Sequence, residues 1–434
     1  MKKINTAPIS GMQELLPKEQ ALFDHFKQQI AKTFAINGFL NIETPAIDRT
    51  EVLLAKAGGE TEKQIYRVFK TAETADDSDQ ALCFDHTVPL ARYLAEHQNQ
   101  LNFPFRVSQI GRIFRGERAQ KGRFREFYQC DIDIIGRSNL PIAYDAEIIS
   151  TLSTALTRLE IPTFTVRLSN RKLLSGIFAS LNLQDKASLI SEILDKSLKV
   201  DQSTTKAALA ELSLKPDQIT VLESLLESKG PFTTAINQLE QLNIRHPDFI
   251  QGVSELKLVS SLLVASQVNF VIDPSIVRGL DYYTGTVFEI FIDNYQSIGS
   301  ICSGGRYEHL AEYYTSQPLP GVGGAIGLTR LFYVLNENKL VKSQEIKPVD
   351  FAIIPFSQTE SIPAITLSRK LQSLGFFTDL IFSDKKLGQR ITHAASIAKH
   401  LIILGESEVK TGKILVKNLQ SSETQPLSEM IKNL

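Results

Sequence analysis

The spacing of apolar residues along the chain predicts a protein of mixed helices and strands. Between residues 17 and 37 apolar side chains recur every three or four positions, which predicts a long helix that ends at Gly38. The next segment, FLNIETPAI, alternates apolar and polar residues and predicts a strand. The same alternation predicts antiparallel strands at residues 105–114 and 127–135, joined by a basic loop.

Further strands and helices follow from the same patterns. Residues 80–85 predict a strand and residues 86–97 a helix. Strands are also predicted at residues 268–272 and 286–292. Residues 321–335, GVGGAIGLTRLFYVL, predict a glycine-rich strand that continues into a helix.

The character of the chain changes twice, which divides it into domains. Leucine, serine, lysine and glutamate dominate after Ser169 with helical periodicity, so this stretch predicts an inserted helical module. After a polar, lysine-rich linker, apolar strands alternate with helices and predict a compact α/β domain. This last domain shows no nucleophile, metal-ligand cluster or phosphate loop, so we expect it to bind rather than catalyse. The predicted boundaries are 1–168 for the first part of the core, 169–255 for the insertion, 256–335 for the second part of the core, 336–347 for the linker and 348–434 for the C-terminal domain.

Composition changes this picture only by what it excludes. The chain has 434 residues, 43% of them hydrophobic, and a formal net charge of -1, which is ordinary for a globular protein and argues against nonspecific coating of DNA. No apolar run approaches the ~20 residues that span a bilayer, and we expect no signal peptide and no membrane partner. The three cysteines form no CxxC pair and the seven histidines no HExxH motif. We therefore expect no zinc site, and a cytoplasmic location with reduced thiols.

The strongest chemical signal is the segment FRGERAQKGRFREFYQCDID at residues 114–133. A guanidinium stays charged at physiological pH and can form paired hydrogen bonds with phosphate or carboxylate oxygens. The segment therefore suggests a cage for anionic ligands, although a solvated basic hairpin would give the same pattern. Its five cations are Arg115, Arg118, Lys121, Arg123 and Arg125.

Two more segments carry a similar chemistry. VRGLDYYTGTVFE, at residues 277–289, places Arg278, an aspartate and two tyrosines between glycines. SGGRY at residues 303–307 and the stretch to Arg330 add arginines beside glycines that permit close backbone approach. Neither GxxxxGK[ST] nor a dinucleotide-binding fingerprint is present. Several arginines without a histidine metal motif suit phosphoryl or nucleotidyl transfer, whose transition state spreads negative charge over oxygens.

Together these segments resemble the histidyl-tRNA synthetases, a family of class II aminoacyl-tRNA synthetases. The long helix and the TP-ended segment after it are similar to the first class II motif, a dimer-interface element. FRVSQIGRIFRGERAQKGRFREFYQCDID is similar to the second motif and GVGGAIGLTRL to the third, while RGLDYYTG and SGGRY resemble the two histidine signatures. The resemblance implies an α/β fold (an α+β catalytic core) with an antiparallel sheet, flanking helices, a helical insertion and a small C-terminal anticodon-binding domain. It also implies a homodimer.

The resemblance implies a two-step reaction. Histidine attacks the α-phosphate of ATP to give histidyl-adenylate and pyrophosphate, and the adenylate then acylates tRNA(His). Arg115 and Arg278 are the implied catalytic residues, on opposite sides of the α-phosphate. Arg115, Arg123 and Arg330 are implied to bind ATP, with Mg²⁺ expected alongside it and no protein ligand assigned to the metal. Adenine would stack on one of two aromatic residues, Phe124 or Phe127.

The histidine site follows from the chemistry of imidazole together with the resemblance. A neutral imidazole offers one donor and one acceptor, so its pocket needs a matching pair such as the Asp133 carboxylate and the Tyr283 hydroxyl. Arg118 and Gln120 are implied to contact the acceptor end of the tRNA. The full set implied for histidine is Asp85, Thr87, Gln129, Asp133, Leu280, Tyr282 and Tyr283.

The chain departs from the commonest bacterial pattern at three positions. Many members have glutamate and glycine where this chain has Asp85 and His86, and glutamate where it has Asp133. Aspartate keeps the acceptor but shortens its reach by one methylene. For His86 we expect a partly exposed position at the end of a strand.

Two other functions fit parts of the chain. A regulatory paralogue that partners ATP phosphoribosyltransferase would share the fold, but such paralogues generally lack the anticodon domain and lose RGLDYYTG. An RNA-sensing domain of a stress kinase is the second, and the sequence contains no kinase segment. Both the C-terminal domain and RGLDYYTG are present here, which favours the synthetase.

Overall fold

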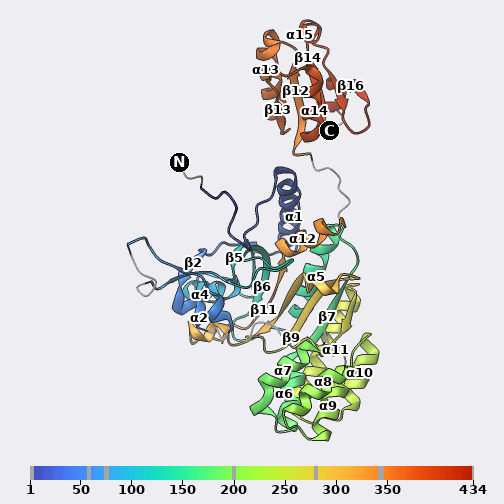
Figure 1. Ribbon diagram of the computed structural model, residues 1–434. Coiled ribbons are helices and arrows are strands. Elements are labelled where there is room, and N and C mark those ends of the chain that lie inside the picture. The colour runs from blue at the N-terminus through green and yellow to red at the C-terminus, as the bar shows by residue number, and fades with distance from the viewer. Residues whose placement is uncertain are drawn as a thin grey trace. The chain divides into compact units, whose positions relative to one another are not determined.

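The structure is a computed structural model that describes residues 4–55, 60–72, 78–197, 202–277, 282–340 and 347–432 (Figure 1). Its contacts divide the chain into two compact units. The first unit comprises Met1–Glu14 and Phe26–Val341, and the second comprises Leu15–His25 and Lys342–Leu434.

An eight-stranded sheet forms the centre of the first unit. Its strands are antiparallel except for two parallel pairs at the edges, β1 with β5 and β7 with β8. This mixed architecture confirms the predicted fold class. In spatial order the strands are β1 (Leu40–Asn41), β5 (Phe105–Phe114), β6 (Glu126–Ile135), β11 (Gly321–Gly327), β10 (Cys302–Tyr307), β9 (Thr286–Ile292), β7 (Phe164–Asn170) and β8 (Phe270–Ile272).

The two faces of this sheet have different neighbours. A Cβ on Gly324 would lie 2.8 Å from a methyl carbon of Leu152, which belongs to α5 (Ala143–Arg158). A Cβ on the adjacent Gly323 would instead meet the carboxylate of Asp133. Because successive residues of a strand face opposite sides, α5 covers one face and Asp133 lies on the other. The polar face is the one that carries the candidate site.

The helix and strand predicted at the start of the chain are only partly confirmed. α1 (Pro17–Ile36) matches the predicted long helix. The strand predicted from FLNIETPAI is wrong in length, since β1 holds only Leu40 and Asn41 before the chain leaves the sheet. The segment continues instead into a small antiparallel sheet in the order β2 (Ile47–Arg49), β4 (Gln80–Leu82) and β3 (Arg67–Val68).

Short helices surround that small sheet. α4 follows β4 closely, and its buried side chains Val88 and Ala91 share a core with Leu53, Tyr282 and Tyr307. This core fixes the start of α4 against the strands of the large sheet. The helices are α2 (Thr50–Leu54), α3 (Glu60–Gln64) and α4 (Thr87–His97).

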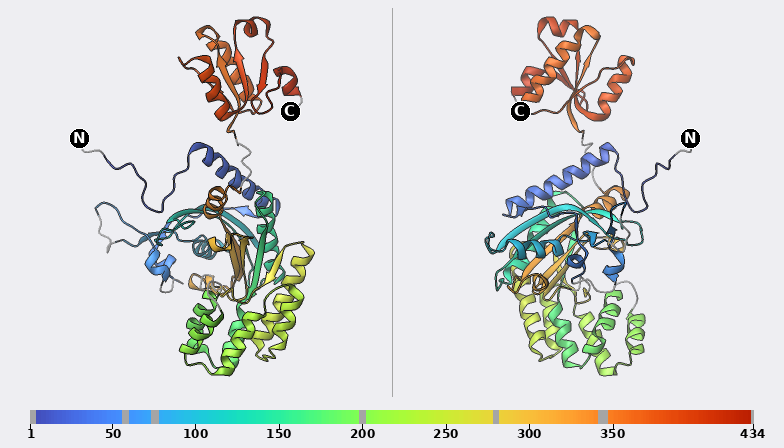
Figure 2. Two further views of the ribbon diagram at one scale, coloured as in Figure 1. Left: turned by 45° about the vertical axis from the view of Figure 1, so that its right-hand side comes forward. Right: turned by 90° about the vertical axis from the view of Figure 1, so that its left-hand side faces the viewer.

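In the described residues, six α-helices separate β7 from β8 along the chain, where the periodicity predicts helices. α6 and α11 pack against one another, and α11 also contacts α5 and β7. The helices α6 to α10 lie together in every view (Figures 1 and 2). The helical run extends ten residues past the predicted boundary at 255. Its members are α6 (Arg171–Ser180), α7 (Ala187–Lys196), α8 (Gln202–Glu211), α9 (Pro216–Glu227), α10 (Phe232–Gln241) and α11 (Pro247–Ala265).

After β11 the chain enters α12 (Leu328–Glu337), which confirms the predicted strand-to-helix segment. Phe332 of α12 packs edge-to-face on Phe26, with ring centroids 6.2 Å apart. The hydroxyl oxygen of Thr329 accepts a hydrogen bond from the backbone N–H of Tyr128 at 2.8 Å, which ties α12 to β6.

The C-terminal domain is a five-stranded sheet covered on both faces. Phe351 and Ile353 of β12 pack with α13, whereas Ala352 and Ile354 pack with Ala394 of α14. This alternation is the burial expected of a central strand between two helical layers. The strand order is β13 (Thr378–Leu380), β12 (Val349–Pro355), β14 (Ala398–Leu404), β15 (Leu415–Asn418) and β16 (Thr424–Pro426), and the helices are α13 (Ser361–Ser373), α14 (Leu387–Ile397), α15 (Glu406–Thr411) and α16 (Leu427–Lys432).

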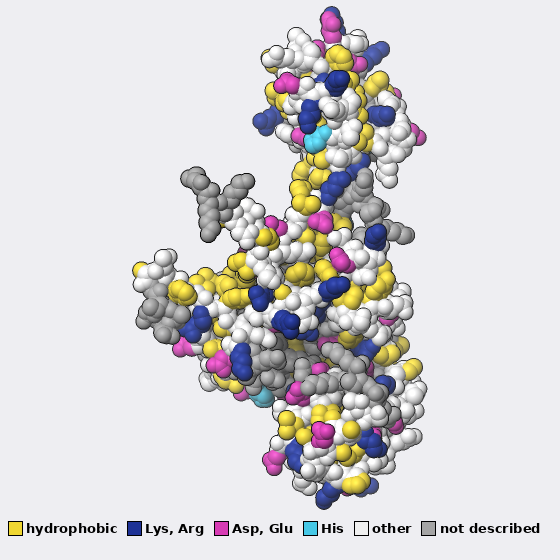
Figure 3. All heavy atoms as spheres, in the orientation of Figure 1, with side chains coloured by type: hydrophobic (Ala, Val, Ile, Leu, Met, Phe, Trp, Pro, Cys, Tyr) yellow, Lys and Arg dark blue, Asp and Glu magenta, His cyan; other side chains and the backbone are white. Residues whose placement is uncertain are grey.

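The surface shows no segregation of charge on the viewed face. Lysine and arginine side chains are interspersed with acidic ones (Figure 3), in keeping with the net charge of -1. Within the described residues, no helix has the length and apolar character needed to cross a membrane.

Candidate active site

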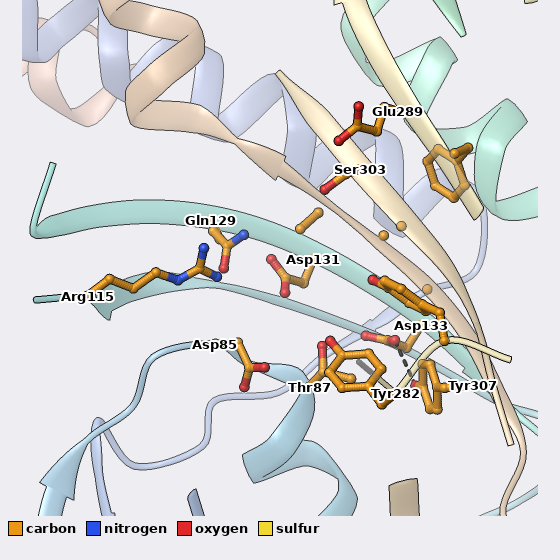
Figure 4. Close-up of a pocket in the computed structure, with 16 residues that line it drawn as sticks. Asp85, Thr87, Arg115, Gln129, Asp131, Asp133, Tyr282, Glu289, Ser303 and Tyr307 are labelled. Atoms are coloured by element: carbon orange, nitrogen blue, oxygen red, sulfur yellow. Dashed lines mark hydrogen bonds between the residues drawn. The ribbon is translucent and has the colours of Figure 1, made fainter. Parts of the chain in front are cut away.

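The polar face of the large sheet contains a cavity of about 280 Å³. Gln129, Asp131 and Asp133 point toward it from alternate positions of β6, because side chains of a strand alternate between its faces (Figure 4). Asp133 pairs in register with Gly323 of β11, where a Cβ would lie 1.8 Å from its Oδ1. The glycine therefore leaves the space that the Asp133 carboxylate occupies.

The other walls come from segments far apart in the sequence. Asp85 and Thr87 lie at the start of α4, and the Asp85 Oδ1 accepts the N–H of Val88 at 3.0 Å. Arg115 closes one end of the cavity, with its Nε donating to the carbonyl of Phe84 at 2.9 Å. The described lining residues are Asp85, Thr87, Arg115, Gln129, Asp131, Asp133, Tyr282, Tyr283, Phe288, Glu289, Ser303, Gly304, Tyr307, Gly323, Gly324 and Ala325.

Three tyrosines form the end of the cavity around Asp133. The hydroxyl of Tyr307 donates to Asp133 Oδ1 at 2.8 Å. The rings of Tyr282 and Tyr283 meet edge-to-face with centroids 4.8 Å apart, and Tyr282 also packs on Tyr307 at 5.8 Å. Burial raises the pKa of all three hydroxyls, so they stay protonated and can donate hydrogen bonds at neutral pH.

The carboxylates of the cavity share an unfavourable environment for charge. Burial raises the pKa of Asp85 to about 6 and that of Asp133 to about 7. Burial also raises the pKa of Asp131, and the neighbouring Asp133 and Asp85 raise it further. Arg115 acts in the opposite direction on Asp85 and Asp131. A cationic ligand would stabilise the ionised forms in the same way.

A second cavity, of about 110 Å³, adjoins the first and shares lining residues with it. Arg115, Gln129, Ser303 and Ala325 line both cavities. The second is the more cationic of the two, because three arginines reach it. Its described lining residues are Arg115, Glu117, Gly122, Arg123, Phe124, Phe127, Gln129, Ser300, Ile301, Cys302, Ser303, Ala325, Gly327 and Arg330.

Local contacts hold those arginines in place. Arg330 donates from Nε to the carbonyl of Gly122 at 3.1 Å and from a terminal nitrogen to that of Ser300 at 3.0 Å. Burial lowers the pKa of Arg330, and the neighbouring Arg123 lowers it further. Arg123 itself lies 3.4 Å from the carboxylate of Glu117. Neighbouring arginines can bind an anion that carries several negative oxygens through charge-assisted hydrogen bonds.

The two aromatic candidates for adenine have different neighbours. The guanidinium of Arg115 lies over the ring of Phe127, 5.3 Å from its centroid. Phe124 packs edge-to-face on Tyr333 at 5.7 Å. Both rings line the second cavity.

The structure therefore gathers most of the predicted site residues around two adjoining cavities. Arg118 and Gln120 lie apart from them, exposed on the loop between β5 and β6. Arg278 and Leu280 fall outside the described residues. The predicted residues that line one or both cavities are Asp85, Thr87, Arg115, Arg123, Gln129, Asp133, Tyr282, Tyr283 and Arg330.

The expectation for His86 is wrong. His86 is buried, directly before α4, and its ring lies against Gly111, where a Cβ would be 3.1 Å from Cε1. Its Nε2 has no hydrogen-bond partner among the described residues. Burial lowers the pKa of His86 to about 4, so the ring is neutral at physiological pH. The sequence could not reveal that a glycine on the neighbouring strand leaves room for it.

Sequence reasoning also assigned no role to four polar residues of the first cavity, namely Asp131, Glu289, Ser303 and Tyr307. Glu289 lies on β9 and accepts a hydrogen bond from the Ser300 hydroxyl at 3.3 Å. Burial raises its pKa to about 7. The alternation of β6 is a signal that could have found Asp131, since it stands two residues from both Gln129 and Asp133. No group of three or more histidine, cysteine or acidic side chains suited to a metal ion occurs in the described part of the chain.

Comparison with known proteins agrees with this geometry. Residues 11–331 match the family model described as histidyl-tRNA synthetase, and residues 350–434 match the anticodon binding domain. The chain is similar to histidine–tRNA ligases of Clostridium tetani (43% identity; 100% of this chain and 99% of the relative) and Finegoldia magna (42%; 99% and 100%). It is also similar to the crystal structure of histidyl-tRNA synthetase from Nostoc sp. PCC 7120, with a TM-score of 0.88, 33% identity, and coverage of 99% of this chain and 100% of that one.

An antiparallel sheet whose polar face joins an amino-acid-sized cavity to an arginine-lined one is the catalytic arrangement of a class II aminoacyl-tRNA synthetase. The matches above narrow the class further. The chain belongs to the histidyl-tRNA synthetase family.

Proposed function

We propose that the protein is a histidine–tRNA ligase that works through a histidyl-adenylate. The carboxylate of histidine attacks the α-phosphate of ATP, an acyl–phosphate bond forms, and pyrophosphate leaves. The 3′-terminal ribose of tRNA(His) then attacks the histidyl carbonyl, and AMP leaves. One observation carries this proposal. A cavity with a donor and an acceptor suited to an imidazole lies next to a cavity lined by arginines, and the two share lining residues.

The first cavity suits the imidazole of histidine. Asp133 would accept the N–H of the ring, and the protonated hydroxyl of Tyr283 would donate to the other ring nitrogen. Tyr282 and Leu280 would complete the pocket wall. Asp85, Thr87 and Gln129 would surround the α-amino group. A pocket built on such hydrogen bonds can reject a wrong side chain by ~10⁴-fold without editing, because a mismatch leaves buried polar groups unpaired.

The second cavity suits the phosphates of ATP. Arg115, which lines both cavities, would hold the α-phosphate and the histidine carboxylate together. Arg330 would meet the γ-phosphate, with Arg123 beside it. Arg278, assigned from its RGLDYYTG motif, would hold the α-phosphate from the other side. Fixed positive charge on both sides stabilises the negative charge that develops during attack.

We include Mg²⁺ with the nucleotide. Magnesium usually takes one or two carboxylates and otherwise phosphate oxygens and water, so a single acidic side chain suffices. Among the described lining residues of the second cavity Glu117 is acidic, and Glu289 of the first cavity accepts a hydrogen bond from Ser300, which lines the second. The metal would offset the charge of the triphosphate.

The remaining partners concern the tRNA and the assembly. Arg118 and Gln120 are exposed on the loop between β5 and β6 and would contact the acceptor end of tRNA(His). The C-terminal domain would bind the anticodon. We also propose that the protein acts as a homodimer in the cytoplasm.

The main rival is a catalytically silent regulatory paralogue. The full-length relatives at 43% and 42% identity are named histidine–tRNA ligases, which favours the ligase, and the match of residues 350–434 to an anticodon binding domain agrees with this choice. The three arginines of the second cavity support the same choice, because a silent paralogue has no need to stabilise a phosphate transition state.

Histidine-dependent exchange of labelled pyrophosphate into ATP tests the proposal directly. We expect exchange with histidine and ~10⁴-fold less, as a ratio of kcat/KM, with any other amino acid. Omitting the amino acid provides the background, and circular dichroism checks that the protein is folded. Folded protein that shows no exchange above background with histidine would overturn the ligase assignment and favour the paralogue.

A further inference from the structure

Three buried acceptor atoms in the first cavity have no hydrogen-bond partner in the described part of the chain. They are Oδ2 of Asp85, Oε1 of Gln129 and Oδ1 of Asp131. Asp131 is only 4% exposed and points toward the cavity from the middle of β6 (Figure 4). Buried acceptors without partners are rare in native proteins, so three in one cavity indicate a ligand that donates hydrogen bonds.

The number of these atoms matches one group of the proposed substrate. An ammonium group has three N–H donors and no acceptor. The α-ammonium of histidine would therefore satisfy all three atoms at once. Thr87 also lines this cavity, but its hydroxyl is not among the buried atoms without a partner.

The position of Asp131 along β6 fits the order of groups in histidine. Gln129 to Asp133 covers roughly 13 Å at ~3.3 Å per residue, with Asp131 midway. Asp133 lies at the tyrosine end of the cavity, and Arg115 at the end shared with the nucleotide cavity. In histidine the α-amino group lies between the ring and the carboxylate. A histidine bound between those two ends brings its ammonium group to Asp131.

We propose that Asp131 binds the α-ammonium group of histidine and completes, with Asp85 and Gln129, a set of three acceptors. This inference rests on the proposed function. It adds a residue that the sequence motifs did not assign.

The charges of the cavity support this role. Asp85, Asp131 and Asp133 face it together, and among the described lining residues Arg115 is the one cation. A ligand ammonium offsets part of this excess. Without a ligand, burial and the neighbouring Asp133 and Asp85 raise the pKa of Asp131, so its ionised form costs the folded protein free energy. We therefore expect Asp131→Asn to stabilise the free protein and to lower its affinity for histidine.

The test compares two ligands that differ only in the amino group, histidine and 3-(imidazol-4-yl)propionate, by isothermal titration calorimetry. Asp131→Asn should lower the affinity for histidine by ~10- to 100-fold, the range for a hydrogen bond to a charged group. The affinity for imidazolylpropionate should stay the same or rise, because that ligand has no cation to lose. The melting temperature of the free variant should equal or exceed that of the wild type.

Asp133→Asn is the matched contrast on the same strand. It should weaken both ligands alike, because both keep the imidazole ring. Asp131→Ala provides a second substitution should the asparagine variant fail to fold, and the same split between ligands is expected. Equal losses for both ligands, or no loss for either, would overturn the role of Asp131.

The outcomes for this inference and for the proposed function are separable. Wild-type protein that binds no histidine and shows no exchange refutes the ligase assignment itself. Wild-type protein that binds histidine, with Asp131 variants that show no split between the ligands, refutes only the ammonium site.

Discussion

Asp133 shows how one residue can favour binding at the cost of stability. Its carboxyl is 3% exposed, accepts a hydrogen bond from Tyr307 and lies in a space left by Gly323. Burial raises its pKa from 3.8 to about 7, so ionisation is costly while the cavity is empty. The ligand-free protein should therefore depend on pH through this residue.

Asp133→Asn should change that dependence in a definite direction. Below pH ~4 Asp133 is protonated in both the folded and the unfolded protein, and wild type and variant should have similar stability. Between pH ~4 and about 7 the folded protein keeps the proton of Asp133 while the unfolded protein releases it. The free energy of unfolding of the wild type therefore falls as the pH rises through about 7. The variant should be more stable by a few kcal/mol at pH 8, because raising a pKa by one pH unit corresponds to ~1.4 kcal/mol.

Urea denaturation of both proteins at pH 4 to 8, without ligand, measures this difference. The comparison cancels the titration of all other groups that the substitution leaves alone. A difference in unfolding free energy that is independent of pH would show that Asp133 does not carry a raised pKa.

At this scale, site residues could be predicted from the sequence where a recognised motif assigned them a role. Asp85, Gln129 and Asp133 were assigned from motifs and do line the first cavity. Asp131 was missed because no motif assigned it a role, although strand alternation gives it the same face as Gln129. The predicted exposure of His86 was wrong because its burial depends on Gly111 of β5. Local sequence patterns do not show such a contact between distant segments.

At the scale of elements, the glycines of β11 leave room for side chains of the neighbouring strands. Gly323 lies opposite Asp133 in register, and any side chain there would overlap the Asp133 carboxylate. The strand thus helps to form the first cavity without contributing a polar side chain.

Gly323→Ala should test this. The added methyl group would displace the Asp133 carboxylate and its hydrogen bond to Tyr307, so histidine affinity should fall at least ~10-fold, the factor for ~1.4 kcal/mol. Overpacking should also destabilise the protein by ~1–3 kcal/mol. Calorimetric titration with histidine and chemical denaturation measure the two effects.

Gly388→Ala is the control for the chemical change. Gly388 lies in α14, and a Cβ there would have no atom within 4 Å. This variant should gain ~0.5–1 kcal/mol of stability from helix propensity and bind histidine normally. Histidine binding by Gly323→Ala at the wild-type level would show that the close approach of β11 is not needed.

Elements with strict periodicity were the most predictable. β5 and β6 and the β11–α12 segment lie where alternation and helical spacing placed them. β1 was overestimated because it is an edge strand that pairs with β5 over two residues, and the chain then leaves for another sheet. Apolar alternation cannot reveal how long a partner strand remains within hydrogen-bonding distance.

At the scale of the whole molecule, chemistry and anticodon binding belong to different compact units. The residues of both cavities lie between Asp85 and Arg330, whereas the match to an anticodon binding domain begins at residue 350. The C-terminal sheet has its own cores on both faces. Removal of residues 348–434 should therefore spare adenylate formation.

The truncated protein should lose charging of full-length tRNA. We expect pyrophosphate exchange within ~3-fold of wild type and a kcat/KM for charging at least ~10-fold lower, which corresponds to ~1.4 kcal/mol of lost tRNA contacts. A minihelix that carries only the acceptor stem serves as the control, because both proteins should charge it equally. Undiminished charging of the full tRNA would refute the anticodon role.

At this scale the sequence predicted a helical insertion between two parts of the core, followed by a linker and a C-terminal domain. The change from strand patterns to leucine-rich helical periodicity predicted that the insertion begins at residue 169. Its end was harder to place, because α11 continues to Ala265 with the same periodicity that it has inside the insertion. α11 packs on α6 and α10 and also on α5 and β7 of the core. Its sequence pattern does not change where these contacts change, so the pattern does not show where the insertion ends.

The wall shared by the two cavities has a consequence for inhibitor design. Arg115, Gln129, Ser303 and Ala325 line both cavities, so the places proposed for histidine and ATP are adjacent. A single stable molecule that joins the two, such as a sulfamoyl mimic of the adenylate, would fill both at once. Once one half is bound, the other is held at a high effective concentration, so the joined molecule loses its translational freedom only once. Its affinity should therefore exceed that of either half by far more than the new contacts alone provide.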